Sequence, residues 1–240
     1  MTAASAPTPP AGTVFADDCA QGVLAFDGAD AAAFLHGQLS TDVAAMGAGE
    51  AAWSSYNSPK GRMLGTLLLW RAGPDAFRAF VAADLVEPLR RRLSLFVLRA
   101  KVAVADQSPD GRRFGVAGPG AADAVRAALG LPEAPAPGHG FAAGGTLVVA
   151  TPDGRCLLHV PAGEADAVEA QLAAHARRVS ADEWALLGSR AGIPEITLAT
   201  QDLFVPQSAN WDLIGGVNFR KGCYPEQEIV ARMQYLGRLK

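Results

Sequence analysis

The sequence predicts an α+β fold built from two units of the ferredoxin-like kind. Half of the 240 residues are apolar, which is enough for a substantial buried core. Strand-like alternation and helical apolar faces follow one another along the chain. The order strand, helix, hairpin, helix also occurs twice, as two split βαβ units would require. Because many α+β proteins contain this order by chance, the pattern alone leaves another α+β arrangement open.

The first predicted unit covers residues 13–110. Asp27 is a candidate helix cap, and the helix that it begins would run to about Gln38. Asp84 followed by Glu87 resembles a capping box for a second helix. Short apolar or alternating runs separated by turn residues predict the strands. These strands are 23–26, 51–56, 63–70, 77–82 and 101–105.

The second predicted unit covers residues 111–178 and repeats the order of the first. Pro152-Asp153-Gly154 is a strong signal for a hairpin. Two Ala-rich runs favour helices. The expected elements are a strand at 114–117, a helix from Pro119 to Gly130, strands at 146–150 and 155–160, and a helix at 164–178.

Residues 179–240 are expected to complete the two units, with interleaving of the chain. Ser180 and Glu183 form a capping box for a further helix. From that helix to Asn218 the residues show little periodicity, and a long loop of this kind in a compact protein is usually functional or poorly ordered. At the other end, residues 1–12 have the composition of a disordered tail.

Composition argues against several classes of protein. The net charge of −3 gives no overall basic field for nucleic acid. Cys19, Cys156 and Cys223 are widely spaced, and no Cys or His pair has zinc-ligand spacing, so we expect no metal. So few thiols also argue against a disulfide framework and fit a reducing cytoplasm. The longest apolar run, 63–70, is too short to span a bilayer, so we expect a soluble protein without a membrane partner.

The stretch 218–232 carries the strongest chemical signal. Cys223 precedes Pro225, which suits the first position of a helix, and Lys221 lies two residues before the thiol. A helix N-terminus and a basic flank both favour a thiolate over a thiol. Glu226 opposes this effect, and a plain helix cap with an idle cysteine is the alternative interpretation.

A long signature begins at this cysteine motif and resembles that of the YgfZ-type folate-binding proteins, a branch of the glycine-cleavage T-protein superfamily. Its residues are Lys221-Gly222-Cys223-Tyr224, Gln227-Glu228 and Ala231-Arg232. Further matches extend the resemblance from about residue 23 to the end of the chain. They are Phe34-Leu35-His36-Gly37-Gln38-Leu39 with Asp42, Asn57-Ser58-Pro59-Lys60-Gly61-Arg62, Leu98-Arg99-Ala100-Lys101-Val102, Arg190-Ala191-Gly192-Ile193-Pro194-Glu195, and Phe204-Val205-Pro206-Gln207 with Asn210.

The resemblance implies two interleaved ferredoxin-like units of the T-protein type and a C-terminal β-barrel. It implies that tetrahydrofolate or a one-carbon derivative binds in a central channel. It also implies support of iron–sulfur cluster assembly or repair in client proteins, and for one bacterial member a link to tRNA modification, which suggests a weak tRNA contact here. Cys223 would act through its thiol, with Lys221 beside it.

Eleven residues are candidates for folate binding. Lys60 and Arg62 could hold the glutamate tail, although a solvated turn is the plainer interpretation. Amides could meet the pterin edge, although buried amides usually satisfy backbone groups. Trp211 could stack on a ring, although tryptophans mostly lie in cores. The full set is Asn57, Lys60, Arg62, Arg190, Glu195, Gln207, Asn210, Trp211, Tyr224, Gln227 and Glu228.

Three departures from the family pattern matter. Glu226 stands where the family usually has Gly, which places charge and bulk beside the thiol. The chain stops at Lys240, about where the β-barrel should begin, so we expect the barrel to be absent. Gly65 and Thr66 stand where catalytic aminomethyltransferases carry acidic residues, so we expect no glycine-cleavage activity.

Two rival functions stay open beside the accessory role. A folate-dependent one-carbon transferase would need an acid near the folate nitrogen. A tRNA- or protein-docking module with a vestigial folate pocket would need a basic patch, whose binding of tRNA would weaken with salt. The candidates for that patch are Arg90, Arg91, Arg92, Arg99, Lys101, Arg112 and Arg113.

Overall fold

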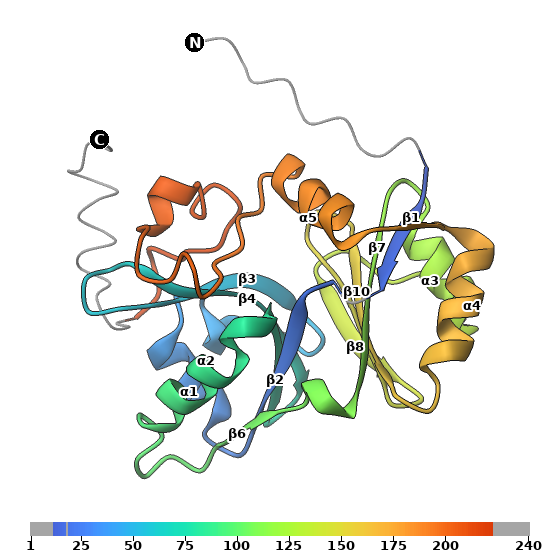
Figure 1. Cartoon of the computed structure of the whole chain (residues 1–240). Coiled ribbons are helices and arrows are strands. Elements are labelled where there is room, and N and C mark those ends of the chain that lie inside the picture. Colours follow the sequence, from blue (N-terminus) through green and yellow to red (C-terminus); the bar gives the residue numbers. More distant parts are fainter. Residues whose placement is uncertain (1–11, 18, 223–240) are drawn as a thin grey trace.

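The computed structural model describes residues 12–17 and 19–222, and it arranges them in two sheets with helices packed against each (Figure 1). The first sheet has the order β3-β4-β5-β2-β6, with every neighbouring pair antiparallel. Its strands are β2 (Gln21–Asp27), β3 (Ala51–Asn57), β4 (Met63–Gly73), β5 (Ala76–Ala82) and β6 (Ala103–Asp106). Helices α1 (Ala31–Gln38) and α2 (Val86–Ser94) lie on one side of this sheet.

The second sheet has the order β11-β1-β7-β10-β9-β8. Its strands are β1 (Val14–Asp17), β7 (Gly111–Ala117), β8 (His139–Ala143), β9 (Thr146–Ala150), β10 (Cys156–Pro161) and β11 (Arg177–Val179). Helices α3 (Ala121–Leu129) and α4 (Ala165–His175) pack beside it and bury a second hydrophobic core. The predicted α+β class, with helices segregated from two largely antiparallel sheets, is confirmed.

The chain crosses between the sheets near its beginning. Strand β1 pairs antiparallel with β7 and parallel with β11, although it precedes every strand of the first sheet. The residues after it cross over and enter β2. The N-terminal strand therefore lies in the sheet that is otherwise formed by residues 111–179.

The sheets also meet where the chain entering β3 runs beside the beginning of β8. The backbone N–H of Ala51 donates to Gly138 O over 2.7 Å, and that of Gly140 donates to Gly49 O over 2.7 Å. A Cβ atom at Gly140 would lie 2.8 Å from Trp70 Cδ1, which is closer than side chains normally pack. Glycine at position 140 thus lets the second sheet approach the core of the first.

Two predicted helix caps of the first unit are wrong, because tertiary contacts use their side chains differently. Asp27 ends β2 and forms an ion pair with Arg78 over 2.7 Å, and α1 begins after Asp30 instead. Asp84 accepts from the backbone N–H of Leu198 over 2.9 Å, so it joins the C-terminal segment to the sheet rather than capping α2.

Other predictions missed a whole strand or misplaced the end of an element. Strands β1 and β8 were not predicted, because each is short and lacks a strong alternating pattern. The helix predicted at 164–178 ends at His175, and the next residues form β11 beside β1. The hairpin between β9 and β10 is confirmed, with Gly154 in the left-handed region at φ +87°.

Helix α5 (Ala181–Arg190) and the segment after it are the last part of the described chain. The capping box at Ser180 and Glu183 is present as predicted. Residues 191–222 then run beside the first sheet without a further α-helix, and contain one short 3-10 helix at Pro206–Ala209. Among the described residues, no helix combines the length and the apolar character needed to cross a membrane.

Candidate functional site

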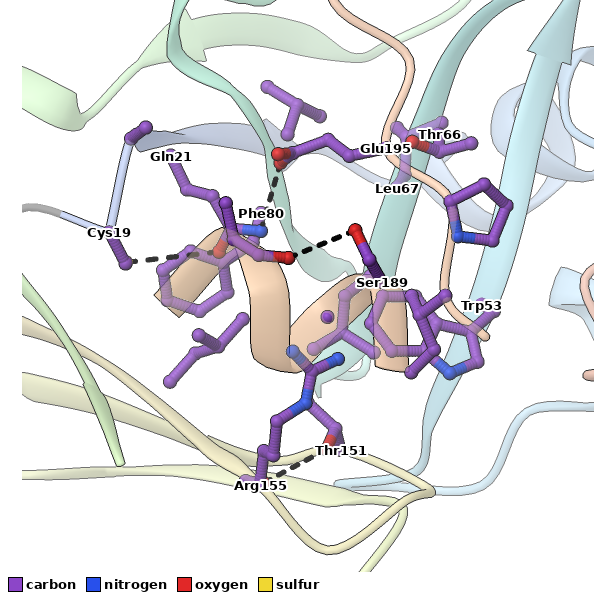
Figure 2. A pocket seen from close by; sticks show the side chains of 18 of the residues that line it. Cys19, Gln21, Trp53, Thr66, Leu67, Phe80, Thr151, Arg155, Ser189 and Glu195 are labelled. Atoms are coloured by element: carbon purple, nitrogen blue, oxygen red, sulfur yellow. Dashed lines mark hydrogen bonds between the residues drawn. The ribbon is translucent and has the colours of Figure 1, made fainter. Parts of the chain in front are cut away.

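A cavity of about 500 Å³ lies between the two sheets, which is a typical size for a small-molecule site. Strands β3, β4 and β5 contribute one wall, and the β9–β10 hairpin contributes another. Helix α5 and residues 192–211 complete it (Figure 2). The crossover from β1 to β2 brings Cys19 and Gln21 to the same space. The cavity thus depends on segments far apart in the sequence.

Three tryptophans with largely buried rings line the cavity. Trp53 of β3 meets Trp211 edge to face, with 5.8 Å between the ring centroids. Trp184 of α5 lines the space as well. Trp211 is fully buried, and its indole Nε1 has no hydrogen-bond partner among the described residues. These packed rings make part of the cavity wall apolar, and only Trp53 and Trp184 keep a small accessible surface.

A carboxyl group projects into the cavity opposite the hairpin. Gln21 Nε2 donates to Glu195 Oε1 over 3.2 Å, and Cys19 Sγ lies 4.0 Å from Gln21 Oε1 (Figure 2). The Glu195 side chain is accessible from the cavity but surrounded by protein, and this desolvation raises the pKa of its carboxyl. Asp84 raises the pKa further, while Gln21 and Arg155 lower it. Together the carboxyl and the amide present both acceptors and donors.

Thr66 occupies the cavity wall where catalytic relatives were expected to carry an acid. Its Oγ1 accepts from the backbone N–H of Ile196 over 3.0 Å, so it fastens the C-terminal segment to β4. The cavity nevertheless contains the carboxyl of Glu195, which enters from a different element. Five of the lining residues were not predicted from the sequence as site residues. They are Cys19, Gln21, Trp53, Arg155 and Trp184. Only the predicted hairpin before Arg155 gave a signal, since it placed that residue at a strand start.

The predicted site residues divide into two groups. Glu195, Asn210 and Trp211 line the cavity. Asn57, Lys60, Arg62, Arg190 and Gln207 do not form part of its lining. Arg190 is exposed at the end of α5, and Gln207 is buried in the 3-10 helix. Asn57 is buried at the end of β3, and neither atom of its amide has a hydrogen-bond partner among the described residues.

Lys60 and Arg62 meet Asp202 of the C-terminal segment. Ser58 Oγ donates to Asp202 Oδ1 over 2.5 Å, and Lys60 Nζ lies 3.9 Å from Asp202 Oδ2. Arg62 Nη1 donates to the Asp202 carbonyl over 3.2 Å. Asp202 itself adopts a left-handed backbone conformation with φ +61°. The β3–β4 loop therefore holds the segment that closes the cavity.

Lys221 is buried and binds the end of α1. Its Nζ donates to the carbonyl oxygens of His36 and Leu39, each over 2.5 Å, and to that of Thr41 over 2.9 Å. Desolvation lowers the pKa of Lys221 to about 8, and Asp42 opposes that shift. The Lys221 ammonium thus anchors the chain just before the cysteine motif. The motif residues Cys223, Tyr224, Gln227 and Glu228 lie outside the described residues.

The proposed basic patch is largely engaged in contacts within the protein. Arg112 forms ion pairs with Asp17, Asp166 and Glu169. Arg113 donates to three backbone carbonyls, and both Arg90 and Arg91 pair with Glu87. Arg112 and Arg113 thus act within the fold, whereas Arg91, Arg99 and Lys101 are exposed.

Known proteins similar to this chain fall into one group by sequence and one by fold. No protein-family model matches the chain. It is 32% identical over 211 residues to the tRNA-modifying protein YgfZ of an Enterobacter species, covering 88% of this chain and 64% of that protein. It is 33% identical over 213 residues to the protein of the same name from Edwardsiella ictaluri, covering 88% and 63%. The chain therefore spans slightly less than two thirds of the length of these relatives.

The structural comparison gives the same fold. The glycine cleavage system aminomethyltransferase T from Bartonella henselae superposes with a TM-score of 0.80 at 20% identity, covering 93% of this chain and 63% of that one. This likeness confirms the predicted T-protein type of fold.

Proposed function

This chain belongs to the same family as the proteins named tRNA-modifying protein YgfZ, and on that premise we propose that it is a folate-binding accessory protein for iron–sulfur enzymes. The observation that carries the proposal is the cavity between the sheets, which is lined by three tryptophans and by a carboxyl paired with an amide. A link to tRNA modification is part of the proposal, because the curated relatives carry that name.

A tetrahydrofolate fits the chemistry of these residues. The accessible parts of Trp53 and Trp184 would contact the ring system, with Trp211 packed behind them. An apolar pocket with a few polar groups is what fixes the orientation of such a ligand. The Glu195 carboxyl and the Gln21 amide would bind the donors and acceptors of the pterin edge. When bound, the folate would supply a one-carbon unit carried on its nitrogens. The chain's part would be to hold that ligand and to exclude water from it.

Calorimetric titration tests the folate site. We expect saturable binding of tetrahydrofolate or 5-formyl-tetrahydrofolate by the purified chain. Glu195→Gln should weaken binding by roughly tenfold or more, because hydrogen bonds to charged groups are the stronger ones. Glu133→Gln is the matched control, since that residue is exposed in a loop away from the cavity. Absence of saturable binding for both ligands would show that the chain is not a folate-binding protein.

The accessory role has its own test, because folate binding alone does not require it. Cys223→Ala should leave folate binding intact but abolish rescue of iron–sulfur enzyme activity in cells that lack the natural protein. Full rescue by the substituted protein would contradict a role for the thiol.

A one-carbon transferase is the second candidate, and the Glu195 carboxyl favours it. Its raised pKa keeps a proton at this carboxyl to a higher pH than is usual for glutamate, as a general acid in the cavity would need. Turnover of methylene-, methyl- or formyl-tetrahydrofolate that disappears in Glu195→Gln would establish this activity. Binding without turnover would leave the accessory role.

A further inference from the structure

We propose that Arg155 recognises the anionic end of the ligand, so that the ligand lies with its ring toward Glu195 and its carboxylate toward the β9–β10 hairpin. This inference rests on the proposed folate site. Among the described residues that line the cavity, Arg155 is the single cation and Glu195 the single carboxylate. Figure 2 shows the Arg155 guanidinium pointing into the space from the hairpin side, with Glu195 on the far side. A ligand with a donor-rich ring and a carboxylate tail matches this polarity.

The Arg155 guanidinium is held in place along one edge. Its Nε donates to Asp153 Oδ2 over 2.7 Å, and its Cζ lies 5.6 Å from the ring centroid of Trp184. The side chain is only 13% exposed. The described residues provide no hydrogen bond to its two terminal nitrogens. Because a guanidinium can bind a carboxylate through two parallel N–H groups, this terminal edge is suited to a ligand carboxylate.

The backbone on both sides of Arg155 fixes the position of that edge. The carbonyl of Arg155 accepts from the N–H of Thr151 over 2.7 Å and from its Oγ1 over 3.0 Å, which fixes the base of the hairpin. A Cβ atom at Gly188 of α5 would lie 3.4 Å from Arg155 Nη1. Helix α5 therefore runs directly beside the terminal edge of the guanidinium and leaves only a narrow gap there.

The proposal changes the expected site for the glutamate tail. From the sequence, Lys60 and Arg62 were candidates for that role, with a solvated turn as the plainer interpretation. Both side chains instead contact Asp202 or its carbonyl, and neither lines the cavity. Arg155 reaches the cavity itself, so a ligand bound there would meet this cation without displacing the loop that holds residues 195–211.

Two ligands that share a ring but differ in the tail separate the binding of the ring from the binding of the tail. Tetrahydrofolate carries the benzoylglutamate tail, and 6-methyltetrahydropterin lacks it. We expect Arg155→Gln to weaken tetrahydrofolate binding by about 10- to 100-fold, the loss typical of a charge-assisted pair, and to leave 6-methyltetrahydropterin binding unchanged. Glu195→Gln should weaken both ligands. Arg126→Gln is the matched arginine control, because that side chain lies on α3 outside the cavity lining, and it should alter neither. Arg62→Gln tests the β3–β4 loop and should show no selective loss of tetrahydrofolate.

Each other result has a definite meaning. If Arg155→Gln weakens both ligands equally, or neither, Arg155 does not recognise the tail. If Arg62→Gln shows the selective loss instead, the tail binds at the β3–β4 loop. If the unsubstituted protein binds neither ligand, the proposed folate site fails and this inference with it. Should Arg155→Gln unfold, Arg155→Lys keeps the cation but removes the fork, and it should show a smaller loss for tetrahydrofolate alone.

Discussion

Lys221 is a buried cation that donates hydrogen bonds to backbone carbonyls at the end of α1. The last carbonyls of a helix have no partner within the helix, and a cation at that end also interacts favourably with the helix dipole. In the sequence this lysine was interpreted as a neighbour that activates the thiol of Cys223. In the structure it connects the C-terminal segment to the first helix.

Replacement of Lys221 tests this anchoring. Lys221→Met keeps the length of the side chain but leaves the carbonyls of His36 and Leu39 without this donor, so the free energy of unfolding should fall by roughly 1–3 kcal/mol. Urea unfolding measures the change. Lys60→Met is the control, because that side chain is 75% exposed and its pair with Asp202 should contribute little. Equal effects of the two substitutions would contradict the anchoring role.

The same residue predicts a pH dependence. Its pKa is about 8 in the folded protein and ordinarily 10.5, so between these values the unfolded chain binds more protons. The free energy of unfolding should therefore rise with pH through Lys221 in this window, and should be independent of pH on its account below about 8. Comparison with Lys221→Met isolates this effect from thiols and tyrosines. The stability difference between the two proteins should grow in favour of the natural one above pH 8.

Among the elements, helix α5 packs closely on β7 because β7 has a glycine, Gly115, at the point of contact. Trp184 of α5 lies over Gly115 of β7, where a Cβ atom would come within 2.4 Å of the indole Cζ2. The absence of a side chain at Gly115 thus lets the Trp184 ring pack directly on the strand backbone. Because Trp184 also lines the cavity and contacts Arg155, this packing determines the shape of the site.

A single methyl group tests that packing. Gly115→Ala should displace Trp184, destabilise the protein by about 1–3 kcal/mol through overpacking, and change the tryptophan fluorescence. Gly37→Ala is the matched control, since nothing lies within 4 Å of a Cβ there and alanine favours the helix by roughly 0.5–1 kcal/mol. A stable Gly115→Ala protein with unchanged fluorescence would mean that α5 does not depend on this contact.

At the scale of the whole molecule, two hydrophobic cores are joined by a strand that crosses between them. Phe15 of β1 is buried in the smaller core, whereas Val14 and Ala16, which alternate with it along the strand, are buried in the larger one. The crossover that follows delivers Cys19 and Gln21 to the cavity. The site therefore requires both sheets to be formed.

Truncation of Phe15 should reveal this dependence. Phe15→Ala should lower the free energy of unfolding by about 3–5 kcal/mol, as is typical for a large buried ring, and should reduce amide protection in β7 and β10. Phe96→Ala serves as the control, because that ring is 45% exposed. If protection fell in β2 and β5 while β7 and β10 kept theirs, the assignment of β1 to the second sheet would be wrong.

Local patterns in the sequence determined the features that need only neighbouring residues. The capping box at Ser180 and the hairpin at Gly154 depend on a few consecutive residues, and both were predictable for that reason. The strands of the first sheet were predictable because buried runs of apolar residues persist for several positions. The long resemblance predicted the T-protein fold, since a signature spread over the chain constrains its topology.

Tertiary structure alone decided which of these residues meet. Asp27 and Asp84 have the chemistry of helix caps, but nearer partners in space take their side chains. Lys60 looked available for an anion until the fold brought Asp202 to it. Arg155 and Gln21 line one cavity from opposite sheets. Their spacing in the sequence does not predict that they line the same cavity. Side-chain chemistry is encoded locally, whereas the partner that uses it is chosen by long-range packing.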